Sequence, residues 1–458
     1  MARRLCSNTE SIMSAQFSSP VLRGVMFLFS IATLASNTGQ AQESCLPSCD
    51  ACGPYDWFAS SDPWCSAVGG DRTQLTGDWS GARTSLTENG VTVDADSTMF
   101  YMGVTGGGVD REFRFSGHND YVINMDLGKM GVQEGLFVKL RAEHRFGESL
   151  AGATGALLPS NFVADLPVAD SRDVYLTNVL ITQMLSEQFG VFFGKMDTLD
   201  GDVNEFAHGR GKTQFSNIAF VASPLVLRTA PYSTLGAGFV ILGEGAEPLF
   251  TFTVLNPTDT ARNSGFNELF NEGVSLVGEL RVPTEVFGLP GHQLFGASWS
   301  SREYVALGQD PRIILPNVPI ARQDGSWSVY WNFDQYLWVD PCNSERGWGV
   351  FGRAGLADPE TNPIAWFLSF GVGGHSLVPG RDNDTFGAGW YYSGTSNELA
   401  PFLATALGGV GDGQGVELYY DVEVTKWLHV TPDLQFVMPA RDAVDTATIA
   451  GVRARVIF

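Results

Sequence analysis

The sequence is poor in basic residues and in histidine. Of its 458 residues, 28 are Lys or Arg against 50 Asp or Glu, and the formal net charge is −22. So acidic a chain is a poor partner for nucleic acid, whose phosphates attract cationic surfaces. Only six histidines are present, and no Ser/His/acid arrangement can be recognised. The sequence therefore argues against nucleic-acid binding and against an enzyme.

Long apolar runs are also scarce. A membrane-spanning helix needs about 20 consecutive apolar residues, but the longest candidate, "VMFLFSIATLA", covers only Val25–Ala35. It follows three arginines and precedes small residues at a cleavage site after Ala41, which is the pattern of an export signal. We therefore predict a signal peptide over 1–41 and export of the rest of the chain.

Cysteines are few, and most of them are crowded into one stretch. Residues 42–74 are rich in Cys, Pro and Ser without periodicity, and we interpret them as a periplasmic leader. Disulfides are favoured there over a zinc site, because the stretch has no histidine and follows an export signal. The candidate disulfide cysteines are Cys45, Cys49, Cys52 and Cys65. With Cys342 the chain after Ala41 has an odd number of cysteines, so the pairing stays open. No metal or cofactor is expected.

What the sequence has in abundance is glycine, aromatic residues and alternation. It contains 53 Gly, 31 Phe, 12 Tyr and 11 Trp. We predict a short amphipathic helix in residues 75–90, from Trp79 to Asn89 and capped by Asp78. From Val91 onward, apolar and polar residues alternate with a period of two, which predicts strands. The stretches that show this best are "LFVKLRAEHRF" (136–146), "WSVYWNF" (327–333) and "VELYYDVEVT" (416–425).

In these strands one face carries charges and the other carries Trp, Tyr and aliphatic residues. That arrangement suits a barrel with lipid outside and water inside. We count sixteen or seventeen segments between Val91 and Phe458, a number that leaves an aqueous channel. Long polar connectors over 147–173, 256–272, 304–325 and 394–415 alternate with tight turns. The predicted fold is all-β, a transmembrane antiparallel barrel of about 16 strands over 91–458.

The chain ends on "GVRARVIF", in which Arg453 and Arg455 alternate with apolar residues up to Phe458. An alternating last strand with a terminal aromatic resembles the assembly signal of bacterial outer-membrane proteins. We therefore predict that Phe458 is part of a signal that the barrel-assembly machinery recognises, and that outer-membrane lipid surrounds the barrel.

Three long blocks carry a family likeness. They are "LTGDWSGARTSLTENGVTVDADSTMFY" (75–101), "GWGVFGRAGLADPETNPIAWFLSFGVGGHSLVPGRDNDTFGAGWYYSG" (347–394) and "ELYYDVEVTKWLHVTPDLQFVMPA" (417–440). Together they resemble the carbohydrate-selective porin family, OprB type. The resemblance implies a 16-stranded outer-membrane barrel through which sugars diffuse, often with a preference for glucose-like solutes. It matches weakly over 147–343, and the leader departs from it.

A sugar path needs planar donors, carboxylate acceptors and aromatic faces, and 23 of the 28 basic residues are arginine, whose fixed fork of donors lysine lacks. Strand parity predicts that Arg141, Glu143, Arg145, Tyr330, Asp334 and Arg353 line the pore. Any one of them is more often generic lining than a selective contact, because every water-filled barrel turns polar residues inward. The acidic total favours cations or neutral solutes, unless lumenal arginines override it locally.

Rival interpretations remain open. The alternatives to a sugar porin are a general diffusion porin, an enzyme such as a lipid hydrolase, and an anchor whose leader binds the cell envelope. The number of strands argues against the enzyme. Whether the barrel is monomeric or a homotrimer is not decided by the sequence. Two motif lookalikes are set aside: "GRGKT" (209–213) lacks the first glycine of a phosphate loop, and "DGDVNE" (200–205) lacks the central glycine of a calcium loop.

Overall fold

The computed structural model describes residues 72–308, 319–399 and 409–458. The predicted signal peptide and residues 42–71 of the leader, with Cys45, Cys49, Cys52 and Cys65, lie outside these ranges. Cys342, in the turn between β10 and β11, is disulfide-bonded.

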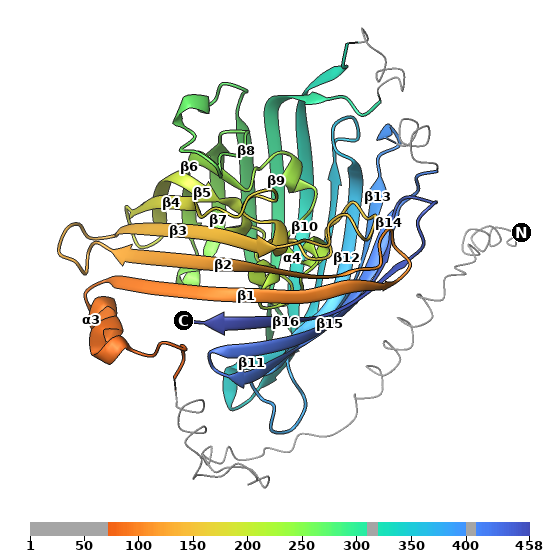
Figure 1. The fold of residues 1–458 in the computed structure, drawn as a ribbon. Helices are drawn as coiled ribbons and strands as arrows, with labels where there is room; N and C mark the ends of the chain where they lie inside the picture. The colour runs from red at the N-terminus through yellow and green to blue at the C-terminus, as the bar shows by residue number, and fades with distance from the viewer. Residues whose placement is uncertain (1–71, 309–318, 400–408) are drawn as a thin grey trace, which may run out of the picture. The chain divides into compact units, whose positions relative to one another are not determined.

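Sixteen antiparallel strands close into one barrel, in which each strand pairs with its neighbours in sequence and β1 pairs with β16 (Figure 1). The predicted fold class is thereby confirmed. Among the described residues, no helix is long and apolar enough to cross a membrane. The strands are β1 Val91–Gly106, β2 Phe113–Asp126, β3 Leu136–Gly147, β4 Tyr175–Met184, β5 Phe189–Asp197, β6 Ser233–Leu242, β7 Pro248–Leu255, β8 Ser275–Val286, β9 Leu289–Val305, β10 Arg322–Asp340, β11 Asn343–Ala357, β12 Ile364–His375, β13 Thr385–Thr395, β14 Gly413–Thr425, β15 Leu428–Met438 and β16 Ala447–Ile457.

The seam between β1 and β16 is where the two ends of the sheet meet. The register runs from Asp96 opposite Ile457 to Gly106 opposite Thr448. The backbone N–H of Phe458 donates to the carbonyl oxygen of Ala95 at 2.9 Å, so the last residue continues the seam. The structure thus gives Phe458 a place in barrel closure, while its part in assembly stays a prediction.

The N-terminal helix is shorter than the sequence predicted. Trp79–Gly81 form a 3-10 turn, and the α-helix α3 covers only Ala82–Glu88. Ser80, inside the 3-10 turn, has a φ of 61°, and Gly81 at the junction with α3 has a φ of 91°, both outside the right-handed helical region. Asp78 makes no side-chain cap to the 3-10 turn, but its Oδ1 accepts from the backbone N–H of Thr84, in the first turn of α3, at 2.8 Å. The expected apolar face is not buried, since Leu86 is 38% exposed.

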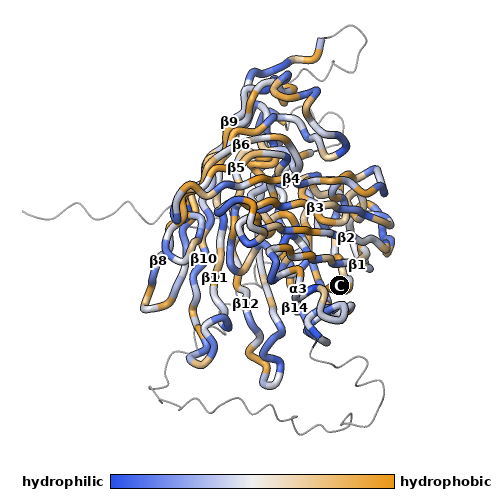
Figure 2. Tube along the Cα trace, turned by 90° about the vertical axis from the view of Figure 1, so that its left-hand side faces the viewer, coloured by the Kyte–Doolittle hydropathy of each residue, from blue (hydrophilic) through white to orange (hydrophobic). Residues whose placement is uncertain are grey.

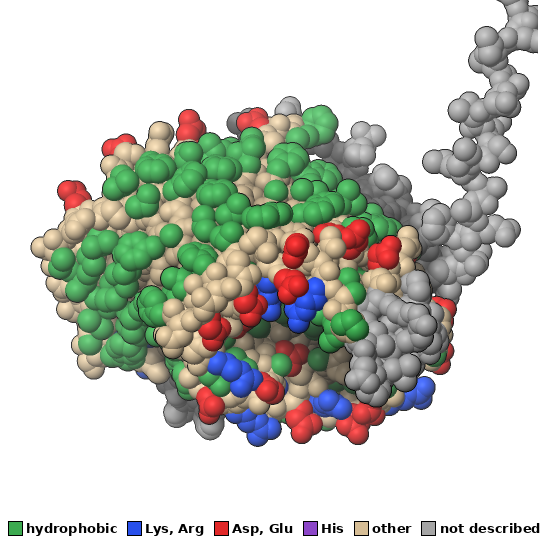
Figure 3. All heavy atoms as spheres, turned by 90° about the horizontal axis from the view of Figure 1, so that it is seen from above, with side chains coloured by type: hydrophobic (Ala, Val, Ile, Leu, Met, Phe, Trp, Pro, Cys, Tyr) green, Lys and Arg blue, Asp and Glu red, His purple; other side chains and the backbone are tan. Residues whose placement is uncertain are grey.

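The two faces of the strands differ as alternation predicts. In β10, Ser328, Tyr330 and Asn332 are buried inside the barrel, while the intervening Trp327, Val329 and Trp331 are about two-fifths exposed on the outer wall. Figure 2 shows short hydrophobic and hydrophilic stretches alternating along the strands. Figure 3 shows a broad hydrophobic outer surface beside a hollow whose border carries acidic and basic side chains. The outer wall therefore suits lipid, and the charges are concentrated elsewhere.

The connections differ in length between the two ends of the barrel. Tight turns join β4 to β5, β8 to β9 and β14 to β15, whereas the predicted long connectors lie at the opposite strand ends. In outer-membrane barrels the longer connections face the outside of the cell. A further long connection, residues 198–232 between β5 and β6, was not predicted; because it packs inside the barrel, we call it the inward loop.

The main hydrophobic core lies inside the barrel and not between two layers. Residues of the inward loop and of the connection between β3 and β4 pack together against the inner wall; they include Leu150, Leu158, Val163, Phe206, Phe215 and Phe220, with Phe351 and Tyr391 from the wall. This packing explains how a long irregular segment keeps one position within a water-filled barrel.

Two glycines of β13 make room for the inward loop. A Cβ on Gly387 would lie 2.7 Å from the ring of Phe215, and a Cβ on Gly389 would lie 2.6 Å from the ring of Phe220. The two phenyl rings also contact each other, with centroids 4.6 Å apart. Side chains at these strand positions would push the loop off the wall.

Gly389→Val should therefore displace Phe220 and destabilise the barrel by about 1–3 kcal/mol, the usual cost of overpacking. Thermal unfolding followed by β-sheet circular dichroism measures this. Gly278→Val in β8 is the matched control, because a Cβ there meets only an ordinary contact at 3.8 Å. Equal unfolding temperatures for the two variants would contradict the close packing of Phe220 against Gly389.

Candidate functional site

The inward loop crosses the barrel interior in short helical steps. It contains the 3-10 turns Thr198–Asp200, Gly209–Gly211 and Val226–Arg228, and the helix α4, Ile218–Val221. Asn217 caps α4 by accepting a hydrogen bond from the backbone N–H of Ala219 at 3.1 Å. All four residues of α4 are buried. A segment this irregular needs partners for its backbone groups, and the barrel wall supplies them.

Arg353 of β11 binds two separate parts of the inward loop, residues 202–207 and Phe220. Its Nε donates to Asp202 Oδ2 at 2.8 Å and its Nη2 to the carbonyl oxygen of Ala207 at 2.7 Å, while Nη1 donates to the carbonyl oxygen of Phe220 at 2.9 Å. The side chain is 1% exposed. Because each guanidinium nitrogen is engaged by the loop, Arg353 acts as a clamp on it.

Asp202 is the centre of this clamp. Besides Arg353, its carboxylate accepts from Asn332 Nδ2 at 2.7 Å and from the backbone N–H of Ser223 at 2.6 Å. Its backbone has a φ of 51°, a conformation that costs energy in a residue with a side chain. The surrounding hydrogen bonds hold the residue in that conformation.

The far part of the loop is fixed to the opposite wall. The Glu417 carboxylate accepts from the backbone N–H groups of Ser216 at 2.6 Å and Asn217 at 3.0 Å. Lys212 Nζ lies 2.8 Å from Asp96 Oδ1, and Arg453 Nη1 donates to the carbonyl oxygen of Gln214. The loop is therefore held from β1 and from β14 to β16 as well as from β11.

Between these anchors lies a group of charges that we call the Arg210 cluster: Lys139, Arg141, Glu143, Asp197, Asp200 and Arg210. Arg210 Nη1 donates to Asp200 Oδ1 at 2.7 Å and Nη2 to Asp197 Oδ2 at 2.5 Å. Arg141 Nη1 donates to the same Asp197 oxygen at 2.7 Å. Lys139 Nζ donates to Asp200 Oδ2 at 2.6 Å. Within the cluster three cations face three carboxylates. Arg141 Nε also lies 3.3 Å from Asp120, and the pairs that continue from Asp120 through Lys212 and Asp96 to Arg455 add two carboxylates and two cations, so the charges still balance.

Part of the cluster remains accessible. The side chains of Asp200 and Lys139 are 39% and 28% exposed, whereas that of Asp197 is fully buried. Burial would raise the pKa of Asp200, but Arg210, Arg141 and Lys139 outweigh it and hold the pKa well below its usual range. Burial would likewise lower the pKa of Arg210, yet Asp197 and the other acidic neighbours raise it. Both groups are therefore charged at neutral pH.

The predicted pore-lining residues are found in different places. Arg141 and Glu143 belong to the Arg210 cluster, and Tyr232 of the inward loop donates to Glu143 at 2.6 Å. Arg145 instead donates to the carbonyl oxygens of Ala164 and Ala169, in the connection between β3 and β4. The structure thus separates Arg145 from Arg141 and Glu143, the other two predicted lining residues of β3.

The remaining three predicted residues line the wall on β10 and β11. Tyr330 donates to Glu279 Oε1 at 2.5 Å, Asp334 lies 2.7 Å from His292 Nδ1, and Arg353 forms the clamp described above. A direct role of these residues in solute selection stays a prediction.

Sequence reasoning missed the inward loop and its side of the cluster. Asp200, Asp202 and Arg210 lie within the two passages that were set aside as calcium-loop and phosphate-loop lookalikes. The useful signal was their density of Gly, Asp and Arg between two strands, outside any alternating pattern. Among residues 72–308, 319–399 and 409–458, no group of three His, Cys, Asp or Glu is arranged to hold a metal ion.

Comparison with known proteins decides the family. Residues 110–458 match the carbohydrate-selective porin family, OprB. The chain belongs to the OprB family of carbohydrate-selective porins. A relative, Porin B of Pseudomonas aeruginosa, is 23% identical over 84% of this chain and 91% of its own length. The high-pH structure of Pseudomonas putida OprB has a TM-score of 0.73 at 21% identity, covering 86% of this chain and 100% of its own. The low-pH structure gives 0.52 at 18% identity, covering 85% and 99%.

Membership in this porin family places the barrel in the bacterial outer membrane and makes it a channel and not an enzyme. Both predictions made from the sequence are confirmed.

Arg353→Ala should release the inward loop of this porin. The change leaves Asp202 buried without its cation, which typically costs about 3–5 kcal/mol. We expect a larger and noisier open-channel conductance, together with weaker block by sugar, in single-channel recordings. Arg346→Ala on the same strand is the control, because Arg346 pairs with Asp340 and Asp382 at the strand ends. Wild-type conductance and noise in Arg353→Ala would show that Arg353 is not a clamp.

Proposed function

We propose that this porin lets small neutral sugars such as glucose diffuse passively through its lumen, with the Arg210 cluster as the selective contact. The observation that supports this is the ion pairing of Arg210, on the loop that narrows the barrel, with Asp200 and Asp197. Part of this cluster, the side chains of Asp200 and Lys139, stays exposed. The predicted residues Arg145, Tyr330, Asp334 and Arg353 complete the Arg-rich and carboxylate lining as its buried part, where they hold the connections and the wall in place.

The chemistry of the cluster fits a polyhydroxyl solute. A sugar hydroxyl both donates and accepts, so it can exchange hydrogen bonds with guanidinium donors and carboxylate acceptors at the same time. Because cations and carboxylates balance, the cluster offers little net attraction to an ion of either sign. Neutral solutes therefore gain contacts here that simple ions do not.

Arg210→Gln should weaken concentration-dependent block by glucose about tenfold, since a hydrogen bond to a charged group contributes about 1.5–3 kcal/mol. It also leaves the cluster negative, so the zero-current potential in a salt gradient should shift toward cation preference. Asp200→Asn removes the opposite charge and should shift that potential the other way.

The control for both variants is Arg262→Gln, which changes an exposed arginine in the connection between β7 and β8. Stable channels with no sugar block in the wild type would favour a general diffusion porin. Equal block and equal potentials in Arg210→Gln and Arg262→Gln would exclude the cluster as the selective contact.

The anchor interpretation makes a different prediction about the leader. Deleting residues 42–74 should leave single-channel conductance and sugar block unchanged, because every contact proposed for solute passage comes from residues after Val91. Loss of envelope association by the deletion variant, in a pull-down with isolated cell wall, would show that the leader has an anchoring role in addition.

A further inference from the structure

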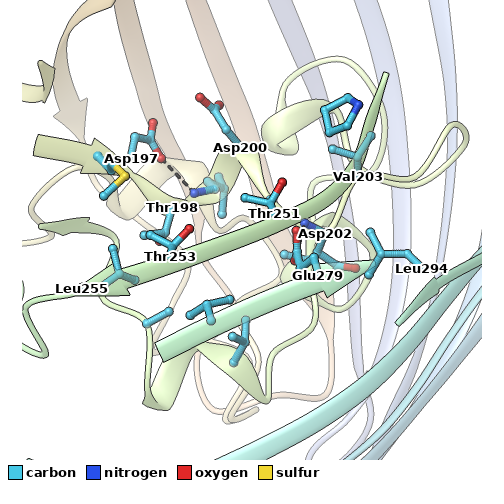
Figure 4. Close-up of a pocket in the computed structure, with 18 of the residues that line it drawn as sticks. Asp197, Thr198, Asp200, Asp202, Val203, Thr251, Thr253, Leu255, Glu279 and Leu294 are labelled. Carbon is cyan, nitrogen blue, oxygen red and sulfur yellow. Dashed lines mark hydrogen bonds between the residues drawn. The ribbon is translucent and has the colours of Figure 1, made fainter. Parts of the chain in front are cut away.

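An apolar groove lies on the outside of the barrel, between the wall of β4 to β7 and the connection between β7 and β8, residues 256–274. We call it the outer groove, and its volume is about 890 Å³. Figure 4 shows Thr251, Thr253 and Leu255 of β7 on the side of the inward loop, whose residues 198–203 line the same inner space. The intervening Val254 lines the outer groove. Because side chains alternate between the two faces of a strand, the outer groove opens toward lipid.

The connection between β7 and β8 is fixed against the outer wall. Lys195 of β5 lines the groove, and its Nζ donates to the carbonyl oxygens of Thr260 and Asn263, both at 2.8 Å. Gly265 packs on Leu235 of β6, since a Cβ on the glycine would lie 3.1 Å from the leucine side chain. A free ammonium group on a lipid-facing wall is costly, so the bonds of Lys195 favour this docked position. The connection therefore forms a fixed second side of the groove.

The wall is recessed at one small residue and bordered by large apolar ones. Ala237 of β6 is exposed, and in the register it lies opposite Phe193 on β5 and Val254 on β7. Phe193 is 52% exposed, and Phe266 of the connection is 71% exposed. A methyl group between larger side chains leaves a depression, and the phenyl rings stand at its sides.

The charges that line the groove have partners. Lys195 is engaged by carbonyl oxygens, and Arg262 pairs with Asp170. Water in such a groove would find few partners, so an apolar occupant matches it better. The groove is also continuous with the lipid-facing wall. A second copy of the chain fits less well, because a convex barrel wall does not enter a groove that a connection partly covers.

The length of the groove matches one leaflet. Tyr175 and Ile181 of β4 both line it, and the strand between them covers roughly 20 Å. At the usual strand tilt this is about 15 Å along the membrane normal, which is half of the ~30 Å hydrocarbon core. The groove lies at the end with the long connections, which faces the outside of the cell. The matching leaflet is therefore the outer one.

We propose that the outer groove binds one acyl chain of an outer-leaflet lipid. The chain extends along β4 and β5, lies over Ala237 and is held between Phe193 and Phe266. This site is on the opposite side of the wall from the Arg210 cluster, so it does not depend on the solute that passes through the lumen.

The test is native mass spectrometry of the intact, detergent-solubilised porin with added dimyristoyl phosphatidylcholine. Wild type should retain one lipid per chain. Ala237→Phe fills the recess with a phenyl ring and should weaken retention about tenfold, in line with the usual effect of overpacking. Ala297→Phe is the matched control, because Ala297 is likewise exposed on the outer wall, in β9, and does not line the groove.

A second variant leaves the strands untouched, in case Ala237→Phe does not fold. Phe266→Ala removes one side of the groove and should weaken retention about fivefold, the effect of losing part of the apolar contact of one ring. Phe287→Ala is its control, because Phe287 is fully exposed in the turn between β8 and β9. Dihexanoyl phosphatidylcholine has the same headgroup and short chains, so it should not be retained.

Loss of lipid from both groove variants, with both controls like wild type, supports the acyl-chain site. Equal retention by the groove variants and their controls overturns it. Equal retention of the dihexanoyl and dimyristoyl lipids by wild type also overturns it, because the headgroup would then be what binds. A dimer of barrels that retains no lipid and that Ala237→Phe abolishes would assign the groove to a second copy of the chain and overturn the proposal as well.

Discussion

The constraint on which the rest of this structure depends is that no backbone hydrogen-bonding group can be left open to hydrocarbon. A sheet meets that constraint in lipid only by closing on itself, and here the closing pair is β1 with β16, ending at Phe458. Closure also separates the two faces of every strand, because one must meet lipid and the other must meet water. The alternation of apolar and polar residues along the sequence results from this separation.

The inward loop faces the same constraint in a different setting. It is irregular and largely buried, so its own N–H and C=O groups need partners that a helix or sheet would otherwise supply. The wall provides them through charged side chains: Arg353 donates to loop carbonyls, and Glu417 accepts from loop N–H groups. Many lumenal charges are therefore structural. Only those with exposed atoms, such as Asp200 and Lys139, are free to meet a solute.

The sequence predicted what is periodic and local and missed what is long-range. Strand parity identified the barrel and put Arg141 and Glu143 on one inner face, because side-chain direction in a strand follows from position alone. It could not show that Arg145 is engaged by a neighbouring connection, or that Arg353 meets Asp202 across about 150 residues of chain. The helix at Ala82–Glu88 was predicted too long because Ser80 adopts a left-handed backbone that composition does not reveal. The inward loop was missed because its anchors are hydrogen bonds between distant segments.

The charge of the whole chain and the charge of the candidate site lead to different expectations about solutes. A net charge of −22 favours cations over anions at the protein surface. At physiological ionic strength, however, exposed charges more than about 8 Å apart are largely screened from each other. A solute at the Arg210 cluster therefore experiences mainly the nearby charges, three cations against three carboxylates, whose ion pairs are 2.5–3.4 Å long. Local balance in an acidic protein is what a channel for neutral polyhydroxyl solutes requires, because attraction to cations would make ions compete for the same hydrogen-bonding groups.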